Sequence, residues 1–198
     1  MYNVKFLDLL NANLKPNPQW IFKDPHPVLR EVTQDIQGYE LSKDDIYYLK
    51  KMVRYIDVCY HNQAKKYKIR AGIAIAANQV GWNKRATYIH FDDGNEEHHY
   101  LLINPHITKR SSQRAYLNPG EGCLSVDHDR SGYVIRYEKV HVKAYDLISE
   151  QFIDKEFSGI IAICIQHEIG HLDAGLYYDN INQDQPFYTE PDWVKIGR

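Results

Sequence analysis

The pattern of hydrophobic and polar residues predicts one long helix early in the chain, strands in the middle and a second helix near the end. Residues 43–64 carry apolar side chains at helical spacing from Ile46 to Ile56, and Ser42 before them is a favourable capping residue. The next part changes to short apolar runs typical of strands, at residues 86–91, 100–107, 134–146 and 152–157. Residues 159–173 are again helical in pattern.

This order of elements predicts an α+β fold. We expect antiparallel β-sheets packed around a central C-terminal helix, with one long N-terminal helix beside them. Asp93 and Gly94 lie between two strand runs and are typical of a hairpin turn. The first thirty residues contain four prolines and are expected to form an irregular arm, and the tail after Gly175 is short and interrupted by prolines. No linker interrupts the pattern, so residues 1–198 are expected to form a single domain.

Composition and charge mainly exclude classes of partner and cellular location. A net charge of −2 gives no basic footprint for nucleic acid or for an anionic membrane. The N-terminus lacks the pattern of a secretory signal, and the longest apolar run, residues 160–165, is too short to span a bilayer. Three cysteines do not suggest a disulfide framework. A cytoplasmic protein without a nucleic-acid or membrane partner is expected.

The segment 166–171 (QHEIGH) carries the strongest chemical signal. Residues four apart share one face of a helix, so His167 and His171 can present two imidazoles to one metal ion. Glu168 lies next to them and can exchange a proton with a water molecule on that ion, which is the chemistry of hydrolytic H-E-x-x-H motifs. Without an ion, His167 would be a hydrogen-bonded core side chain and Glu168 a solvated one.

A catalytic site of this kind needs a third protein ligand. The usual metallopeptidase arrangements fit poorly, because position 177 is a tyrosine and the downstream Glu190 lies on the proline-rich tail. The cysteines remain as candidates. Cys59 and Cys164 lie on apolar helical faces, where a thiol is usually a packing residue. Cys123 differs, because its glycine-rich segment allows the backbone to approach a ligand closely.

Three separated segments resemble the peptide deformylase family in the same order. Residues 72–79 (GIAIAANQ) resemble its first motif, residues 121–125 (EGCLS) match its second, and residues 166–172 (QHEIGHL) resemble its third. The resemblance covers roughly residues 24–180. The long span between the first two motifs and the short tail are similar to the Gram-positive-type form, also called type 2.

The resemblance implies a hydrolase of protein biosynthesis that removes the formyl group from N-formylmethionine at the N-terminus of nascent polypeptides. It implies Cys123, His167 and His171 as metal ligands and Glu168 as general base and acid. The expected ion is Fe²⁺, and Zn²⁺ or Ni²⁺ can occupy the same donor set. Because the substrates are nascent chains, transient proximity to the ribosome is expected.

The same resemblance implies the groups that contact the substrate. Gln79 and the backbone N–H of Leu124 would stabilise the oxyanion. Ile73 and Gly122 would bind the peptide as an added strand. The methionine side chain would lie against a wall formed by Ile160, Ile163 and Cys164.

Three positions depart from the family pattern, namely Ala74, Gly170 and Ala174. Gly170 replaces an aspartate expected to orient a ligating histidine. None of the three removes a metal ligand, so an active enzyme is predicted. The alternatives are an inactive or weakened metal-binding paralogue, favoured by these departures, and a metalloendopeptidase that uses the same helix.

The polar residues 92–99 suggest a solvated turn rather than a second metal site, because they surround the predicted hairpin. His90, His106, His128 and His141 lack ligand spacing and are interpreted as structural or surface residues.

Overall fold

The computed structural model describes residues 1–11 and 13–197. Its helices are α1 (Phe6–Leu9), α2 (Lys43–Tyr60), α3 (Ala64–Tyr67) and α4 (Ile160–Leu172), with 3₁₀ turns η1 (Pro18–Trp20), η2 (Pro27–Arg30), η3 (Ala77–Val80) and η4 (Tyr177–Asn180). Its strands are β1 (Ala74–Ala76), β2 (Ala86–Asp92), β3 (Glu97–Arg110), β4 (Arg114–Asn118), β5 (Arg136–Tyr137), β6 (Lys139–Asp146), β7 (Gln151–Ser158) and β8 (Val194–Gly197). Within the described ranges, no helix is both long and apolar enough to cross a membrane.

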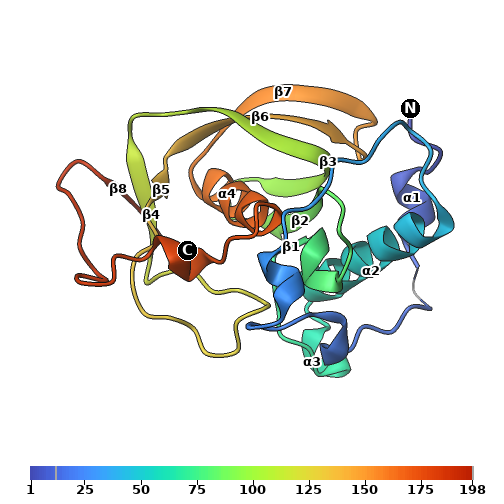
Figure 1. Cartoon of the computed structure of the whole chain (residues 1–198), viewed down its shortest axis with the longest axis horizontal. Helices are drawn as coiled ribbons and strands as arrows, with labels where there is room; N and C mark the ends of the chain where they lie inside the picture. The colour runs from blue at the N-terminus through green and yellow to red at the C-terminus, as the bar shows by residue number, and fades with distance from the viewer. Residues whose placement is uncertain (12, 198) are drawn as a thin grey trace.

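A five-stranded antiparallel sheet in the order β1-β2-β3-β6-β7 curves over α4 (Figure 1). Strands β2 and β3 form the hairpin predicted from Asp93 and Gly94, with Asp92 opposite Glu97 beside the turn. Strand β7 is an edge strand with mostly exposed, charged side chains, which discourages pairing with a further strand. The α+β architecture and the antiparallel main sheet therefore agree with the prediction.

The smaller sheet has the order β5-β4-β8 and lies on the other side of α4 from the five-stranded sheet (Figure 1). Strand β5 pairs with β4 antiparallel, whereas β8 pairs with β4 in parallel, with Leu117 opposite Ile196. The tail is therefore a structured part of the sheet, and the expectation of antiparallel pairing alone was wrong for this strand. The pairing joins residues almost eighty positions apart, and the sequence pattern contains no signal for it.

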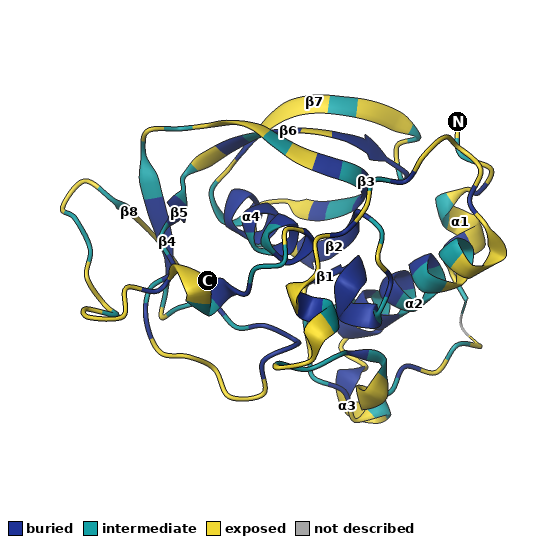
Figure 2. Cartoon of the chain, viewed as in Figure 1, coloured by how far each residue is buried: buried dark blue, intermediate teal, exposed yellow. Residues whose placement is uncertain are grey.

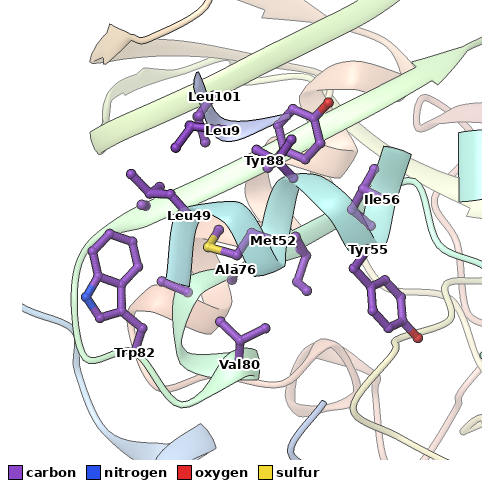
Figure 3. Packing of buried hydrophobic residues seen from close by; sticks show 14 of the residues in the cluster. Leu9, Leu49, Met52, Tyr55, Ile56, Ala76, Val80, Trp82, Tyr88 and Leu101 are labelled. Carbon is purple, nitrogen blue, oxygen red and sulfur yellow. The ribbon is translucent and has the colours of Figure 1, made fainter. Parts of the chain in front are cut away.

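Helix α2 begins where the sequence predicts and ends four residues earlier. The Ser42 hydroxyl accepts the Asp45 N–H, and the Asp45 carboxylate accepts the Ser42 N–H, which completes a capping box. Its buried face contacts β1, η3 and β2 through Leu49, Met52 and Ile56 (Figure 3). The helix ends because Asn62 adopts φ 58°, a left-handed conformation that asparagine tolerates.

Helix α4 lies between the two sheets and is buried over most of its surface (Figure 2). Ile161, Ile165 and Ile169 pack against the five-stranded sheet, and Ile163 packs against Leu117 of β4. Burying each of these side chains contributes about 1.5–3 kcal/mol. The polar residues of α4 therefore project from a helix held rigidly by apolar contacts on both sides.

Candidate active site

A cavity of about 350 Å³ opens between β1 with the residues before it, the segment 121–124 that follows β4, and α4. It collects almost all of the residues that the sequence singles out for catalysis or substrate binding. Those lining it are Ile73, Gln79, Gly122, Cys123, Leu124, Ile160, Ile163, Cys164, His167 and Glu168. His171 lies directly behind this lining, in contact with Cys123 and His167. The three motifs therefore meet in space.

Cys123, His167 and His171 bring three donor atoms together. The Cys123 Sγ lies 3.2 Å from the His171 Nε2, which in turn lies 3.2 Å from the His167 Nε2. Helical spacing places both imidazoles on one face of α4, and the segment that follows β4 carries the thiol to them. Cys123 and His171 are almost completely buried.

This donor set fits a divalent transition metal ion. Two imidazole nitrogens and a sulfur converge within 4.8 Å of one another, which suits ions such as Zn²⁺ and Fe²⁺. Burial opposes ionisation of the Cys123 thiol, but the charge of His171 and hydrogen bonds from both imidazoles hold its pKa well below the ordinary value. The thiolate is the form that ligates metals.

A buried ion pair orients His167. The Nδ1 of His167 lies 2.7 Å from the Glu121 Oε2, and Arg136 donates two hydrogen bonds, of 2.6 and 2.8 Å, to the same carboxylate. Burial alone would raise the pKa of Glu121, but Arg136 and His167 lower it to about 2. A carboxylate at Nδ1 keeps the proton on that nitrogen and turns Nε2 towards the other ligands.

Sequence reasoning missed this pair. Glu121 stands inside the quoted second motif, but it received no role there. Arg136 is fifteen residues further on and is the first residue of β5, and no spacing rule links the two positions.

Burial would lower the pKa of His167, whereas hydrogen bonds to Cys123 and Glu121 raise it to about 10.

Glu168 lies in the cavity wall next to the three potential metal ligands. Its side chain is buried, and its Oε2 has no hydrogen-bond partner among residues 1–11 and 13–197. Burial raises the pKa of Glu168. A carboxylate with an unsatisfied buried oxygen and a raised pKa is suited to exchanging a proton with a molecule in the cavity.

Gln79 and Leu124 bring two potential hydrogen-bond donors to the cavity lining. The Gln79 Nε2 donates to the Ser125 Oγ at 3.0 Å and contacts the Cys123 Sγ at 3.6 Å, while its Oε1 accepts the Ala76 N–H at 2.8 Å. This fixes the side chain with its amide nitrogen towards the thiolate. No hydrogen bond from the Leu124 N–H occurs in the described part of the chain.

The remaining cavity wall is apolar on one side and formed by backbone on the other. Ile160, Ile163 and Cys164 of α4 form the apolar side together with Leu117 and Phe91. Across the opening, the first and second motifs approach closely, since a Cβ at Gly72 would lie 3.0 Å from the Leu124 side chain. A side chain at position 72 would therefore require the Leu124 side chain to shift.

Ile73 and Gly122 lie at the entrance. Ile73 precedes the edge strand β1, and its carbonyl already accepts the His90 N–H at 2.9 Å. A Cβ at Gly122 would meet the Arg70 guanidinium, which donates two hydrogen bonds to Asp129. Arg70 and Asp92 also line the cavity, and sequence reasoning did not select them.

A family model for polypeptide deformylase matches residues 18–187 of the chain. The chain belongs to the polypeptide deformylase family. It is 89% identical over 198 residues to a peptide deformylase of Ureaplasma parvum serovar 3, covering all of both chains. It is 38% identical over 180 residues to Peptide deformylase 2 of Geobacillus stearothermophilus, covering 90% of this chain and 97% of the relative. The second match supports the Gram-positive-type resemblance.

Solved structures show the same family. A class I type b peptide deformylase from Acinetobacter baumannii with bound Met-Ala-Ser superposes with a TM-score of 0.63 at 27% identity, covering 81% of this chain and 96% of that one. The chain is therefore a metal-dependent deformylase with this family's fold. Formyl removal from nascent polypeptides is the reaction of the family.

Two departures from the family pattern have visible consequences. Ala174 follows α4 with φ 65°, a left-handed conformation that favours glycine. The His171 Nδ1 is buried and lacks a hydrogen-bond partner within the described residues, and Gly170 next to it carries no side chain that could supply one. A Cβ at Gly170 would meet no atom within 4 Å beyond its neighbours and the backbone of α4.

The polar turn also differs from its interpretation as a solvated loop. His98 is buried and contacts the Asp93 Oδ2 through its Nε2 at 3.0 Å, and His90 is buried as well. His90 and His99 stack with ring centroids 3.8 Å apart. The interpretation as a solvated turn was therefore wrong for His98, whereas His90, interpreted as structural or surface, is buried.

Proposed function

We propose that this chain deformylates N-formylmethionyl peptides with Cys123, His167 and His171 as the ligands of one divalent ion and Glu168 as general base and acid. The observation that carries the proposal is the convergence of these three donor atoms beside a buried carboxylate, at the end of an apolar cavity. In support, His167, Glu168 and His171 all belong to α4, which lies between the two sheets.

A divalent ion held by Cys123, His167 and His171 would supply Lewis acidity and lower the pKa of water. We propose Fe²⁺ as the native ion, with Zn²⁺ or Ni²⁺ able to replace it. Glu121 and Arg136 hold His167 in the tautomer that this requires.

Glu168 takes a proton from the attacking water on its carboxylate and returns it to the departing amine. Burial raises the pKa of Glu168, which favours its protonated form and so supports the return of the proton. Gln79 Nε2 and the Leu124 N–H donate hydrogen bonds to the formyl oxygen as negative charge develops on it. Losing one such donor typically costs about 10²–10³-fold in rate.

The peptide binds as an added strand beside β1, which among residues 1–11 and 13–197 pairs with no strand but β2 and so has one free edge. Ile73 and Gly122 flank that edge. The methionine side chain enters between Ile160, Ile163 and Cys164. We further propose that residues 1–198 act as a single cytoplasmic domain that meets its substrates near the ribosome.

The test is formate release from formyl-Met-Ala-Ser by the purified, metal-loaded protein, alongside Met-Ala-Ser and a longer formylated peptide. Formate release without internal cleavage supports the proposal. Cleavage inside the longer peptide would indicate a metalloendopeptidase. The absence of both formate release and cleavage with a fully metallated sample would indicate an inactive paralogue. Metal analysis of Cys123→Ser tests the ligand, because hydroxyl replaces thiolate and bound metal should fall.

A further inference from the structure

A second group of metal-binding side chains lies at the β2–β3 hairpin. Among residues 1–11 and 13–197, two groups of histidine, cysteine or acidic side chains bring at least three ligand atoms within 4.8 Å of one another. One is the active-site group. The other consists of His90, Glu97 and His99.

Strand register explains why these three residues meet. His90 on β2 stands directly opposite His99 on β3, so both side chains point to the same face of the sheet. Glu97 precedes His99 by two positions and therefore shares that face. Residues nine positions apart show no ligand spacing along the chain, which is why sequence reasoning interpreted His90 as structural.

Two tyrosines hold the imidazoles in place. The Tyr88 hydroxyl lies 3.3 Å from the His90 Nδ1 and 3.0 Å from the His99 Nε2, so it contacts one nitrogen of each ring. Tyr60, the last residue of α2, stacks on His90 at 3.6 Å and donates a hydrogen bond to Glu97. The group is thus fixed by α2 on one side and by the hairpin on the other.

The remaining nitrogen of His90 faces a carboxylate and solvent. The His90 Nε2 lies 2.9 Å from the Glu97 Oε1. Half of the Glu97 side chain is exposed, whereas His90 is buried, so an ion can enter from the Glu97 side. No hydrogen bond to the His99 Nδ1 occurs in the described part of the chain, which leaves that nitrogen available.

We propose that His90, Glu97 and His99 bind a second divalent ion of the Zn²⁺ class. Two imidazole nitrogens and one carboxylate oxygen are a common donor set for such ions, with solvent completing the coordination. Binding requires Glu97 to exchange its bond with His90 for the ion. It also requires the two imidazoles to rotate out of their parallel stacking, because their in-plane lone pairs do not converge there. Phe91, Asp92 and Asp93 follow His90 and line the active-site cavity, so the ion would fasten the hairpin directly behind that wall.

The experiment counts ions on the whole protein. Wild type, with its active site loaded, is dialysed against micromolar Zn²⁺ and analysed for bound metal, beside the His90→Gln/His99→Gln double variant and His98→Gln. His98 belongs to the same hairpin, but it points to the opposite face and is the matched control. We expect about two ions per chain in wild type and His98→Gln and about one in the double variant.

Co²⁺ distinguishes the two sites within wild type. An ion at Cys123 gives a thiolate charge-transfer band in the near ultraviolet, whereas the second equivalent should add only the visible bands of nitrogen and oxygen ligation. Glu97→Gln alters an exposed side chain and should weaken the second equivalent about tenfold, or 1.4 kcal/mol. All variants should keep formate release.

A single ion on wild type at saturation, or a second ion kept by the double variant, would overturn the proposal. The histidines and tyrosines of the hairpin would then form only a hydrogen-bonded aromatic network. Loss of the second ion from His98→Gln would overturn the assignment of the ligands.

Discussion

Helices α2 and α4 pack against opposite faces of the five-stranded sheet and differ in how much of their surface is buried. Tyr88 of β2 contacts the cluster around α2, while the next residue, Ile89, contacts the cluster around α4. Helix α2 buries one face and exposes the other, as an amphipathic helix does. Helix α4 is buried nearly all round, yet it carries two histidines and a glutamate.

The difference shows where each helix obtains its stability. Polar groups on α2 contact solvent and add little energy. The polar groups of α4 are taken out of water, so each needs a partner from another segment or from a ligand. The Glu121–Arg136 pair provides one such partner, and the metal ion would provide others. Substitutions of polar residues on or around α4 should therefore cost far more than substitutions of polar residues on α2.

The largest effect is expected at Glu168. Glu168→Gln keeps the shape of the side chain and removes its capacity to exchange a proton, so kcat for formate release should fall by about 10²–10⁴-fold. The metal content should stay at the wild-type level, because Glu168 is not placed as a ligand. Near-normal turnover in this variant would exclude Glu168 as the base.

Glu121→Gln should destabilise the fold by about 3–5 kcal/mol, because it leaves the buried Arg136 charge unpaired. Urea unfolding at pH 7 measures this. The pKa of Glu121 in the folded chain, about 2, lies below the ordinary value of 4.5. The stabilisation is thus fully present above pH 4.5 and lost as the pH falls from 4.5 towards 2. If the difference in free energy of unfolding between variant and wild type stayed constant across that pH range, the Glu121 carboxylate would not be the source of the stabilisation.

Ile165→Ala should cost about 2–5 kcal/mol, because it opens a cavity at a fully buried position of α4. The matched change on the exposed face of α2 is Tyr47→Ala, for which we expect about 0.5 kcal/mol or less. Thermal unfolding of both variants compares the two helices directly. Equal losses would show that the helices do not differ in this way.

Gly170→Asp should raise metal retention by up to about tenfold by giving the buried His171 Nδ1 an acceptor. Gly170→Ala fills the same open space without a carboxylate and is the control. Chelator competition measures the ion's affinity. If alanine and aspartate behave alike, orientation of His171 does not limit metal binding.

The smallest changes in stability are expected just after the C-terminal ends of α2 and α4. Ala174 and Asn62 both adopt left-handed conformations after their helices, but only asparagine tolerates this well. Ala174→Gly should therefore stabilise the protein by about 1 kcal/mol, whereas Asn62→Gly should change it by a few tenths. Urea midpoints of the two variants give the comparison.

Local chemistry explains which elements the sequence could predict. Ser42, the apolar stripe of α2 and the Asp93–Gly94 turn act over a few residues, and the structure confirms the helix start and the hairpin. The spacing of His167 and His171 likewise predicts that both lie on one face of one helix. The roles of these residues stay predictions, although the structure brings their side chains together.

The contacts that were missed join distant segments. Arg136 reaches Glu121, β8 reaches β4, and His90 meets His99 only through strand register. Each depends on how the sheets are arranged, which no local pattern specifies. The short strand β1 was missed because Ala74, Ile75 and Ala76 are buried together and show no alternation.

The parallel pairing of β8 with β4 has a practical consequence for handling the protein. Leu117 lines the substrate cavity and stands opposite Ile196, so the last few residues support the cavity from behind. Carboxypeptidase trimming, or a bulky purification tag at this end, would disturb substrate affinity without touching a catalytic group. Preparations should be checked by mass spectrometry before their kinetic constants are compared.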